Sequence, residues 1–249
     1  MAGVDRRERL SNGVMLPALC IALATQLATD GVIRVAGVLP EALAADVRGV
    51  ALAAAVSNAP RQEVPLSLKN AAVASAAAAV ATSRVGRALE DMCGDAPLFD
   101  LCSVISAPGA PAQPLHSDLG FAGDAAAPLY TCFVALQETP FKLGPTEFCL
   151  GSHTDAAAHG VLRGDGGLLE DAVPFALAVG EAVVFDARIA HRGGANRSTR
   201  HRAFLSLTFA NPRGSAPVIV PAPGDVLVSE GGAEADGGGA WTLRELREA

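Results

Sequence analysis

The sequence predicts an α+β protein with a mainly β core, in which helices come first along the chain and strands follow. Residues 40–92 contain long alanine-rich stretches, which favour helices. From residue 98 onward, short apolar runs are separated by turns that contain Gly and Pro, a texture typical of a β-sandwich or barrel. Helices gathered at the front and strands behind them give the α+β plan.

The N-terminal segment, residues 1–29, has an apolar stretch from Val14 to Leu27 behind three arginines. A secretory signal has the same pattern. The stretch leads directly into the apolar run Val32–Val38, which is typical of the first strand of a folded domain. We therefore expect an amphipathic helix here rather than a signal. No stretch is long and apolar enough to predict a membrane span.

Two helices are expected next. Pro40 suits the first turn of a helix that runs to Val56 and has alanines in its body. A second helix is expected from Leu66 to Met92, where the alanine run Ala71–Ala81 would let it pack closely on a sheet. Gly94 is placed to end it.

The strands expected after these helices form, together with them, one domain over residues 30–221. Residues 222–249 are rich in Gly and acidic residues and predict a flexible tail with a short helix at its end. Turn signals at Pro108-Gly109, Gly144-Pro145 and Gly180-Glu181 separate several of the strands. The expected strands are Leu98–Ser106, Leu115–Asp118, Leu129–Gln137, Thr146–Leu150, Phe175–Leu177, Ala182–Asp186 and Ala203–Phe209.

Composition excludes several classes of protein. The 249 residues, half of them hydrophobic, can bury one substantial core. The net charge of -7, with 19 Lys and Arg spread along the chain, argues against a nucleic-acid partner and against an anionic membrane surface. Five cysteines without a CxxC pair favour small buried thiols and a reducing, cytoplasmic compartment. The oligomeric state is left open.

The histidines indicate a metal site. His116-Ser117-Asp118 lies on or at the end of an expected strand, where residues i and i+2 point to the same face. The His116 imidazole and the Asp118 carboxylate can therefore converge on one point. His191 follows a later apolar run and completes the set if the fold brings it near. Two imidazoles and one carboxylate form the facial triad of non-haem iron oxygenases.

A dicarboxylate cosubstrate that binds the metal at one end needs a cation at the other. Arginine suits this role, because its planar guanidinium meets a carboxylate with two hydrogen bonds. Arg202 directly precedes the expected strand Ala203–Phe209, and Arg197 and Arg200 are nearby competitors.

Four blocks together make the chain resemble the phytanoyl-CoA dioxygenase family of iron(II)/2-oxoglutarate oxygenases. The resemblance implies a double-stranded β-helix, a jelly-roll or cupin-like fold, with N-terminal helices packed on the outer sheet. The blocks occur in the family's order between residues 30 and 210: Gln113–Asp118, Gly144–Phe148 with Gly151-Ser152-His153, Gly180–Asp186, and His191–Ser198 with Arg202 at its end.

The resemblance also implies roles for individual residues. His116, Asp118 and His191 would bind Fe(II), leaving positions open for 2-oxoglutarate and O2. Arg202, favoured over Arg200 by its spacing from His191, would hold the distal carboxylate of 2-oxoglutarate. Gln113 is a further candidate for contact with the cosubstrate.

Two positions depart from the family's pattern. Many relatives have Ser two residues after the distal histidine, where this chain has Gly193, and many have Trp where it has Phe133. Relatives that halogenate tend to lack the carboxylate ligand, so the presence of Asp118 favours hydroxylation.

The residues around these blocks carry structural expectations. His153 follows Gly-Ser in a turn and is expected to have a structural or supporting role. Asn196 and Ser198 are expected to hydrogen-bond the turn after the distal histidine. Gly193 and Gly194 are expected to let the chain bend sharply there.

The expected activity is hydroxylation of a small organic molecule, with release of succinate and CO2. A metal-dependent isomerase or lyase on the same fold would not need Arg202. A non-catalytic binding module would be expected to have lost metal ligands, and all three are present here. No basic cluster predicts a site for the phosphates of coenzyme A.

Overall fold

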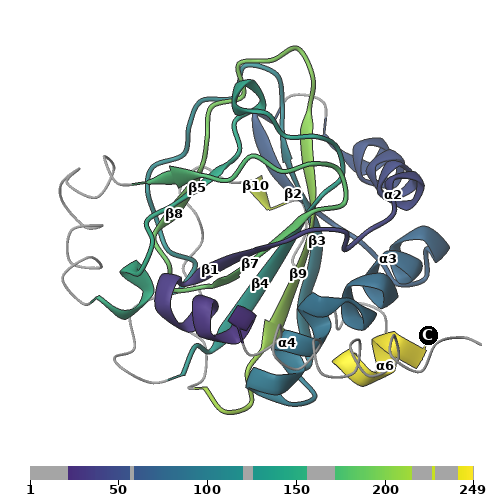
Figure 1. The fold of residues 1–249 in the computed structure, drawn as a ribbon. Coiled ribbons are helices and arrows are strands. Elements are labelled where there is room, and N and C mark those ends of the chain that lie inside the picture. Colours follow the sequence, from purple (N-terminus) through teal and green to yellow (C-terminus); the bar gives the residue numbers. More distant parts are fainter. Residues whose placement is uncertain are drawn as a thin grey trace, which may run out of the picture.

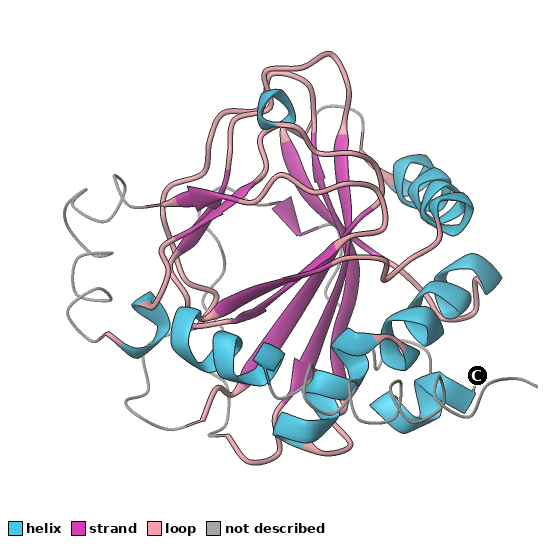
Figure 2. Cartoon of the chain, viewed as in Figure 1, coloured by secondary structure: helices cyan, strands magenta, loops and turns pink. Residues whose placement is uncertain are grey.

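Two β-sheets and a layer of helices make up the described part of the chain (Figures 1 and 2). The computed structural model describes residues 22–56, 59–119, 126–155, 172–214, 226–227 and 241–248.

The larger sheet is antiparallel throughout, except where β10 runs parallel to β2. The smaller sheet is antiparallel and carries the distal histidine. Strands far apart in the sequence are neighbours in both sheets, so the expected jelly-roll fold is confirmed. In spatial order, the larger sheet contains β1 (Val32–Val35), β7 (Ala182–Asp186), β4 (Leu129–Ala135), β9 (Arg202–Ala210), β3 (Leu98–Ser106), β2 (Arg61–Pro65) and β10 (Val226–Leu227), and the smaller sheet contains β6 (Val173–Pro174), β5 (Thr146–Phe148) and β8 (His191–Gly193).

Two of the expected strands are wrong. Leu115–Asp118 does not form a strand, and only His116 in it makes an isolated bridge, to His191. Phe175–Leu177 is displaced, because the strand lies at Val173–Pro174 and Leu177 pairs singly with Thr139. The other expected strands are present, and β3 and β7 have the expected bounds.

The long helix expected from Leu66 to Met92 is also wrong. The structure has two helices, α3 (Ala71–Thr82) and α4 (Arg84–Cys93), on either side of Ser83. Ser83 has extended backbone angles, and its Oγ accepts a hydrogen bond from Val85 N at 3.1 Å, so it ends one helix and caps the next.

Asn70 is the N-cap residue of α3. Asn70 Oδ1 accepts hydrogen bonds from Ala72 N and Val73 N, which fixes the start of α3. The other elements agree better with expectation: α2 spans Glu41–Ala54, and Gly94, with φ of 77°, ends α4.

The helices cover the outer face of the larger sheet (Figure 1). Alternate residues of β9 show the division: Ala203, Leu205, Leu207 and Phe209 belong to the core shared with the helices, whereas Phe204 belongs to a second core between the sheets. Alanines of α3 are fully buried in the outer core and allow the helix to lie close to its neighbours. Arg202 lies on the same side of β9 as Phe204, so it faces the space between the sheets.

The structure describes a helical segment near each end of the chain. Residues 22–30 are helical, and the rest of the expected N-terminal helix lies outside the described residues. At the other end, α6 (Leu243–Glu248) packs on α3, with Leu243 buried in the outer core. The Gly-rich residues 228–240 of the expected tail lie outside the described residues.

Two general expectations can be compared with the described residues. Four cysteines there are free and buried, as expected: Cys93, Cys102, Cys132 and Cys149. No helix in the described ranges has the length and apolar character needed to cross a membrane.

Gly180, which precedes β7, packs against the backbone of Leu39 in the segment before α2. A substitution at Gly180 tests how close this contact is. Its φ is 74°, and a Cβ there would overlap the carbonyl oxygen of Leu39. We expect Gly180→Ala to lower the free energy of unfolding by about 3 kcal/mol, measured by urea denaturation, since backbone strain and steric overlap both oppose the side chain.

Gly37 provides the matched control. Its φ is 67°, but no atom lies within 4 Å of the Cβ position. Gly37→Ala should therefore cost only about 1 kcal/mol, from the left-handed backbone alone. Equal losses for the two variants would contradict the packing described here.

Candidate metal centre

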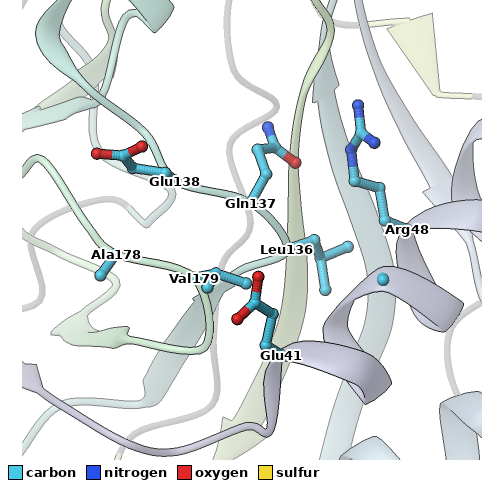
Figure 3. Close-up of a pocket in the computed structure, with 8 residues that line it drawn as sticks. Glu41, Arg48, Leu136, Gln137, Glu138, Ala178 and Val179 are labelled. Carbon is cyan, nitrogen blue, oxygen red and sulfur yellow. The ribbon is translucent and has the colours of Figure 1, made fainter.

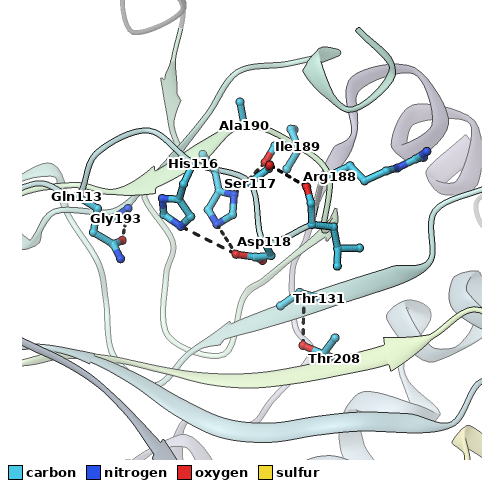
Figure 4. A network of polar contacts seen from close by, with 12 residues as sticks. Gln113, His116, Ser117, Asp118, Thr131, Arg188, Ile189, Ala190, Gly193 and Thr208 are labelled. Atoms are coloured by element: carbon cyan, nitrogen blue, oxygen red, sulfur yellow. Dashed lines mark hydrogen bonds and ion pairs between the residues drawn. The ribbon is translucent and has the colours of Figure 1, made fainter. Parts of the chain in front are cut away.

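The three predicted metal ligands meet at one point, and Figure 4 shows two of them, His116 and Asp118, side by side. Ligand atoms of His116, Asp118 and His191 all lie within 4.8 Å of one another. Asp118 Oδ1 is 3.9 Å from His116 Nε2 and 3.6 Å from His191 Nε2. The structure thus brings His191 next to His116 and Asp118, although β4, β5, β6 and β7 lie between Asp118 and His191 in the sequence.

A pair of backbone hydrogen bonds joins the two histidines. His116 N donates to His191 O at 2.9 Å, and His191 N donates to His116 O at 2.8 Å. The ring centroids are 4.6 Å apart, and Phe185 packs 5.1 Å from the His191 ring. Because His191 is only 4% exposed, packing and the backbone bridge together fix its direction.

The second nitrogen of each ring assigns its tautomer. His116 Nδ1 lies 2.9 Å from Pro114 O, and His191 Nδ1 lies 3.0 Å from Ile189 O. A carbonyl only accepts hydrogen bonds, so each Nδ1 carries the proton and each Nε2 keeps its lone pair for a metal. Two such imidazoles and a carboxylate, with no thiolate, fit Fe(II).

Burial sets the charge of the ligands. It raises the pKa of Asp118 to about 6, against the opposing effect of nearby His116, and it lowers the pKa of His191 to about 4. At neutral pH, Asp118 is therefore ionised and His191 is neutral. Both residues are therefore in the form that binds a metal ion.

Ser152 holds the residue before His191. It lies in the short 3-10 helix η2 (Ser152–Thr154), where its Oγ accepts from Ala190 N at 2.8 Å and donates to Cys149 O at 2.7 Å. Cys149 N donates in turn to Ala190 O at 2.9 Å. The sequence marked this Gly-Ser-His turn, but it gave no role to the serine.

A buried ion pair fixes the same loop from its other end. Asp186 at the end of β7 accepts from Arg188 Nε at 3.0 Å and from Arg188 Nη2 at 2.7 Å, and both residues are buried. Arg188 N also donates to Asp186 Oδ1 at 2.9 Å. The loop that delivers His191 is therefore held by side chains on both sides, and the sequence reasoning missed this pair.

Arg202, the predicted cation for the cosubstrate, is 1% exposed between the sheets. Its Nη1 donates to Gly144 O, and its guanidinium carbon lies 5.0 Å from the centre of the Phe204 ring. The competitors Arg197 and Arg200 are exposed. Only Arg202 of the three places a charge inside the fold.

Phe133 packs on the aromatic ring that contacts this cation. Its ring stacks on Phe204, with centroids 5.7 Å apart and planes at 5°. The position where many relatives have Trp thus still carries an aromatic ring next to the predicted cosubstrate site.

Gly193 is surrounded by two polar side chains. Gln113 Oε1 accepts from Gly193 N at 2.8 Å (Figure 4), and a Cβ on Gly193 would lie 2.6 Å from this oxygen and would overlap Arg61 Nη1. Arg61 Nη2 donates to Pro111 O at 2.6 Å and to Gly194 O at 2.9 Å. Arg61 and Gln113 thus occupy the space that a larger residue at 193 would need.

The backbone angles at positions 193 and 194 do not require glycine. Neither Gly193 nor Gly194 has a positive φ. Instead, both are places of close approach, since a Cβ on Gly194 would lie 2.8 Å from Pro145 O. The sequence missed Arg61 because β2, which carries it, fell between two expected helices.

Other expectations around the site are confirmed. Asn196 Oδ1 accepts from Ser198 N at 3.0 Å and Asn196 Nδ2 donates to Arg200 O at 2.8 Å, which holds the turn that leads to Arg202. His153 is structural, because it is 2% exposed and its Nε2 lies 3.1 Å from Ala28 O.

A surface pocket lies elsewhere, between α2 and the loops after β4 and before β7 (Figure 3). None of the predicted site residues lines it. Its lining residues are Glu41, Ala45, Arg48, Leu136, Gln137, Glu138, Ala178 and Val179.

Ser152→Ala tests whether the loop around His191 tunes the metal site. We expect the variant to bind Ni(II) about 10-fold more weakly in calorimetry, because supporting hydrogen bonds orient the ligand. Thr154→Ala is the control, since Thr154 lies in the same turn but is exposed and bonds only Gly151 O. Unchanged affinity in Ser152→Ala would show that the loop needs no such support.

The pKa of Asp118 predicts how metal affinity depends on pH. Below pH 6 a proton competes with the metal for this carboxylate, whereas His191 stays neutral down to about pH 4. Ni(II) affinity should be level above about pH 7 and should fall by roughly 10-fold per pH unit below 6. Constant affinity between pH 7 and pH 5 would mean that Asp118 is not a ligand.

Comparison with known proteins agrees with this geometry. Dioxygenase trt7 of Aspergillus terreus (strain NIH 2624 / FGSC A1156) is 34% identical over 109 residues, which are 41% of this chain and 36% of that protein. The likeness thus spans little more than a third of that relative's length.

Solved structures share the fold at low sequence identity. The α-ketoglutarate-dependent epimerase SnoN is 22% identical, with a TM-score of 0.61 over 78% of this chain and 84% of its own. HygX from Streptomyces hygroscopicus, solved with nickel and 2-oxoglutarate, is 13% identical, with a TM-score of 0.60 over 79% of this chain and 94% of its own. The sequence pattern of phytanoyl-CoA dioxygenase (PhyH) matches residues 29–204. The chain therefore belongs to the phytanoyl-CoA dioxygenase (PhyH) family.

Proposed function

We propose that the chain is an Fe(II)- and 2-oxoglutarate-dependent dioxygenase that hydroxylates a small organic molecule. One observation carries the proposal: the His116, Asp118 and His191 ligand atoms converge, and the buried guanidinium of Arg202 packs on the same aromatic cluster as His191. Arg202 contacts the Phe204 ring, and the Phe133 and Phe185 rings continue from there to His191. A metal site alone suits many reactions. A buried cation on the same side of the sheet adds a binding place for the far carboxylate of a dicarboxylate.

Three residues would hold the iron, and each has a defined state. His116 and His191 offer Nε2 lone pairs, and ionised Asp118 balances part of the metal charge. When bound, the iron supplies the redox chemistry by which O2 oxidises 2-oxoglutarate to succinate and CO2 and delivers an oxygen atom to the substrate. The protein contributes ligand geometry, cosubstrate orientation and exclusion of water.

Arg202 fixes the orientation of 2-oxoglutarate. The strand position and the contact with Phe204 hold its guanidinium in place, so a carboxylate meets a charge that needs little rearrangement. Phe133 and Phe204 stack beside it and keep water from the carboxylate–guanidinium pair. Low local polarity makes that charge interaction stronger than it would be in solvent.

The primary substrate would bind between the sheets on the side of the metal site that lies away from Arg202. Thr131 and Thr208 lie on the Asp118 side of the site, away from Gln113 and Gly193 (Figure 4), and their hydroxyls are 3.1 Å apart. These hydroxyls offer hydrogen bonds to a polar group of a small substrate. The acidic net charge and the uncharged threonine pair do not favour a coenzyme A ester.

The proposal predicts oxygen-dependent succinate formation by the iron-loaded protein, measured by chromatography against a library of small substrates. Asp118→Ala and His116→Ala should abolish it. Arg202→Gln should raise the KM for 2-oxoglutarate on the order of 100-fold, because two charge-assisted hydrogen bonds are lost.

Arg200→Gln is the matched control, since Arg200 is exposed two residues away and its loss should leave the KM unchanged. Melting temperatures identify variants that fail to fold. Full succinate formation in Asp118→Ala would overturn the proposal. Turnover of a substrate without 2-oxoglutarate would point to an isomerase or lyase.

A further inference from the structure

A row of three polar residues crosses β2, β3 and β9 at one end of the larger sheet. The strand register places Arg61 opposite Ser106 and Ser106 opposite Arg202. Residues directly opposite each other on neighbouring strands have side chains on the same face, with Cβ atoms about 5 Å apart. Ser106 therefore stands between two arginines, and all three residues are buried.

This row faces the space between the sheets. Ile105 and Ala203, the neighbours of Ser106 and Arg202 along their strands, belong to the outer core under the helices. Side chains alternate along a strand, so Ser106 and Arg202 point to the inner side, where Phe204 packs. Arg61 connects the row to the metal centre, because its Nη2 lies 3.2 Å from Gly193 O, two residues after His191.

The hydroxyl of Ser106 has no hydrogen-bond partner in the described part of the chain, although the residue is 0% exposed. A buried hydroxyl without a partner has lost its hydrogen bonds to water without replacement, which is unfavourable. Ser103 on the same strand shows the ordinary arrangement: it is equally buried, faces the outer side, and donates to Phe204 O at 2.9 Å. Of these two buried serines, it is Ser106, on the inner face of the sheet, whose hydroxyl lacks an acceptor among the described residues.

The neighbours of Ser106 indicate the charge of the missing partner. Arginines on both neighbouring strands make this end of the sheet positive, which favours an anion, and a hydroxyl donor adds a hydrogen bond to one of its oxygens. A carboxylate bound by Arg202 has two oxygens and several lone pairs, so it can accept from Arg202 and Ser106 together.

We propose that Ser106 is a cosubstrate-binding residue, whose Oγ donates a hydrogen bond to the distal carboxylate of 2-oxoglutarate beside Arg202. The inference rests on the proposed function and extends it to a residue on a neighbouring strand. It also gives the site a hydroxyl donor although position 193 is glycine. Binding of 2-oxoglutarate thus removes an unsatisfied buried group.

Calorimetry on the Ni(II)-loaded protein tests this without turnover. Ser106→Ala should weaken 2-oxoglutarate binding about 10-fold, the loss of one charge-assisted hydrogen bond. The melting temperature without 2-oxoglutarate should stay level or rise, because the variant lacks the unsatisfied hydroxyl. Ser106→Thr keeps the hydroxyl and should bind more tightly than Ser106→Ala.

Ser103→Ala is the matched control on the same strand. It should lower the melting temperature and leave the affinity for 2-oxoglutarate unchanged, since it removes a satisfied hydrogen bond on the outer face. Oxalate provides a second comparison, because it chelates a metal but has no distal carboxylate. Ser106→Ala should bind oxalate as tightly as the natural protein does.

Equal 2-oxoglutarate affinity in Ser106→Ala and the natural protein would overturn the role of Ser106 alone. An equal loss for oxalate would also overturn it, because the effect would then lie at the metal. If the natural Ni(II)-loaded protein fails to bind 2-oxoglutarate at all, the proposed function itself is contradicted.

Discussion

The backbone bridge between His116 and His191 is the interaction on which the rest of the site depends. Its two hydrogen bonds join the segment after β3 to β8 in the smaller sheet. Asp118 follows on the same segment, so the bridge also sets where the carboxylate lies. Ser152 and the Asp186–Arg188 pair act on the loop before His191 and keep the bridge in register. The site therefore forms only where the segment after β3 is hydrogen-bonded to β8 of the smaller sheet.

The two sheets divide the chemistry between them. The segment that bridges to the smaller sheet and β8 itself carry the proposed metal ligands, whereas β9 of the larger sheet carries the cation proposed to bind the cosubstrate. Asp118 and Arg202 differ in how readily they change their protonation state on burial. Burial raises the pKa of Asp118 towards neutrality, while Arg202 stays charged because a guanidinium hardly loses its proton in proteins.

The sequence was informative where function depends on local spacing. His116 and Asp118 converge as expected, although the segment is positioned by an isolated bridge at His116 rather than by a strand. Strands β3 and β7 could be bounded because turn residues flank runs that are mostly apolar. β2 could not be found, since one side of it lines a polar interior and its residues read as Arg-Gln-Glu-Val-Pro. The row that contains Ser106 depends on register between distant strands, which no local pattern reveals.

The most direct measurement of the central claim is the visible absorption of the Fe(II)-loaded protein without oxygen. Chelation of iron by a 2-oxo acid gives a charge-transfer band that neither component gives alone. We predict that the band appears when 2-oxoglutarate is added and disappears on exposure to O2, with succinate formed in equal amount. A protein that binds Fe(II) but shows no band with 2-oxoglutarate would contradict the account.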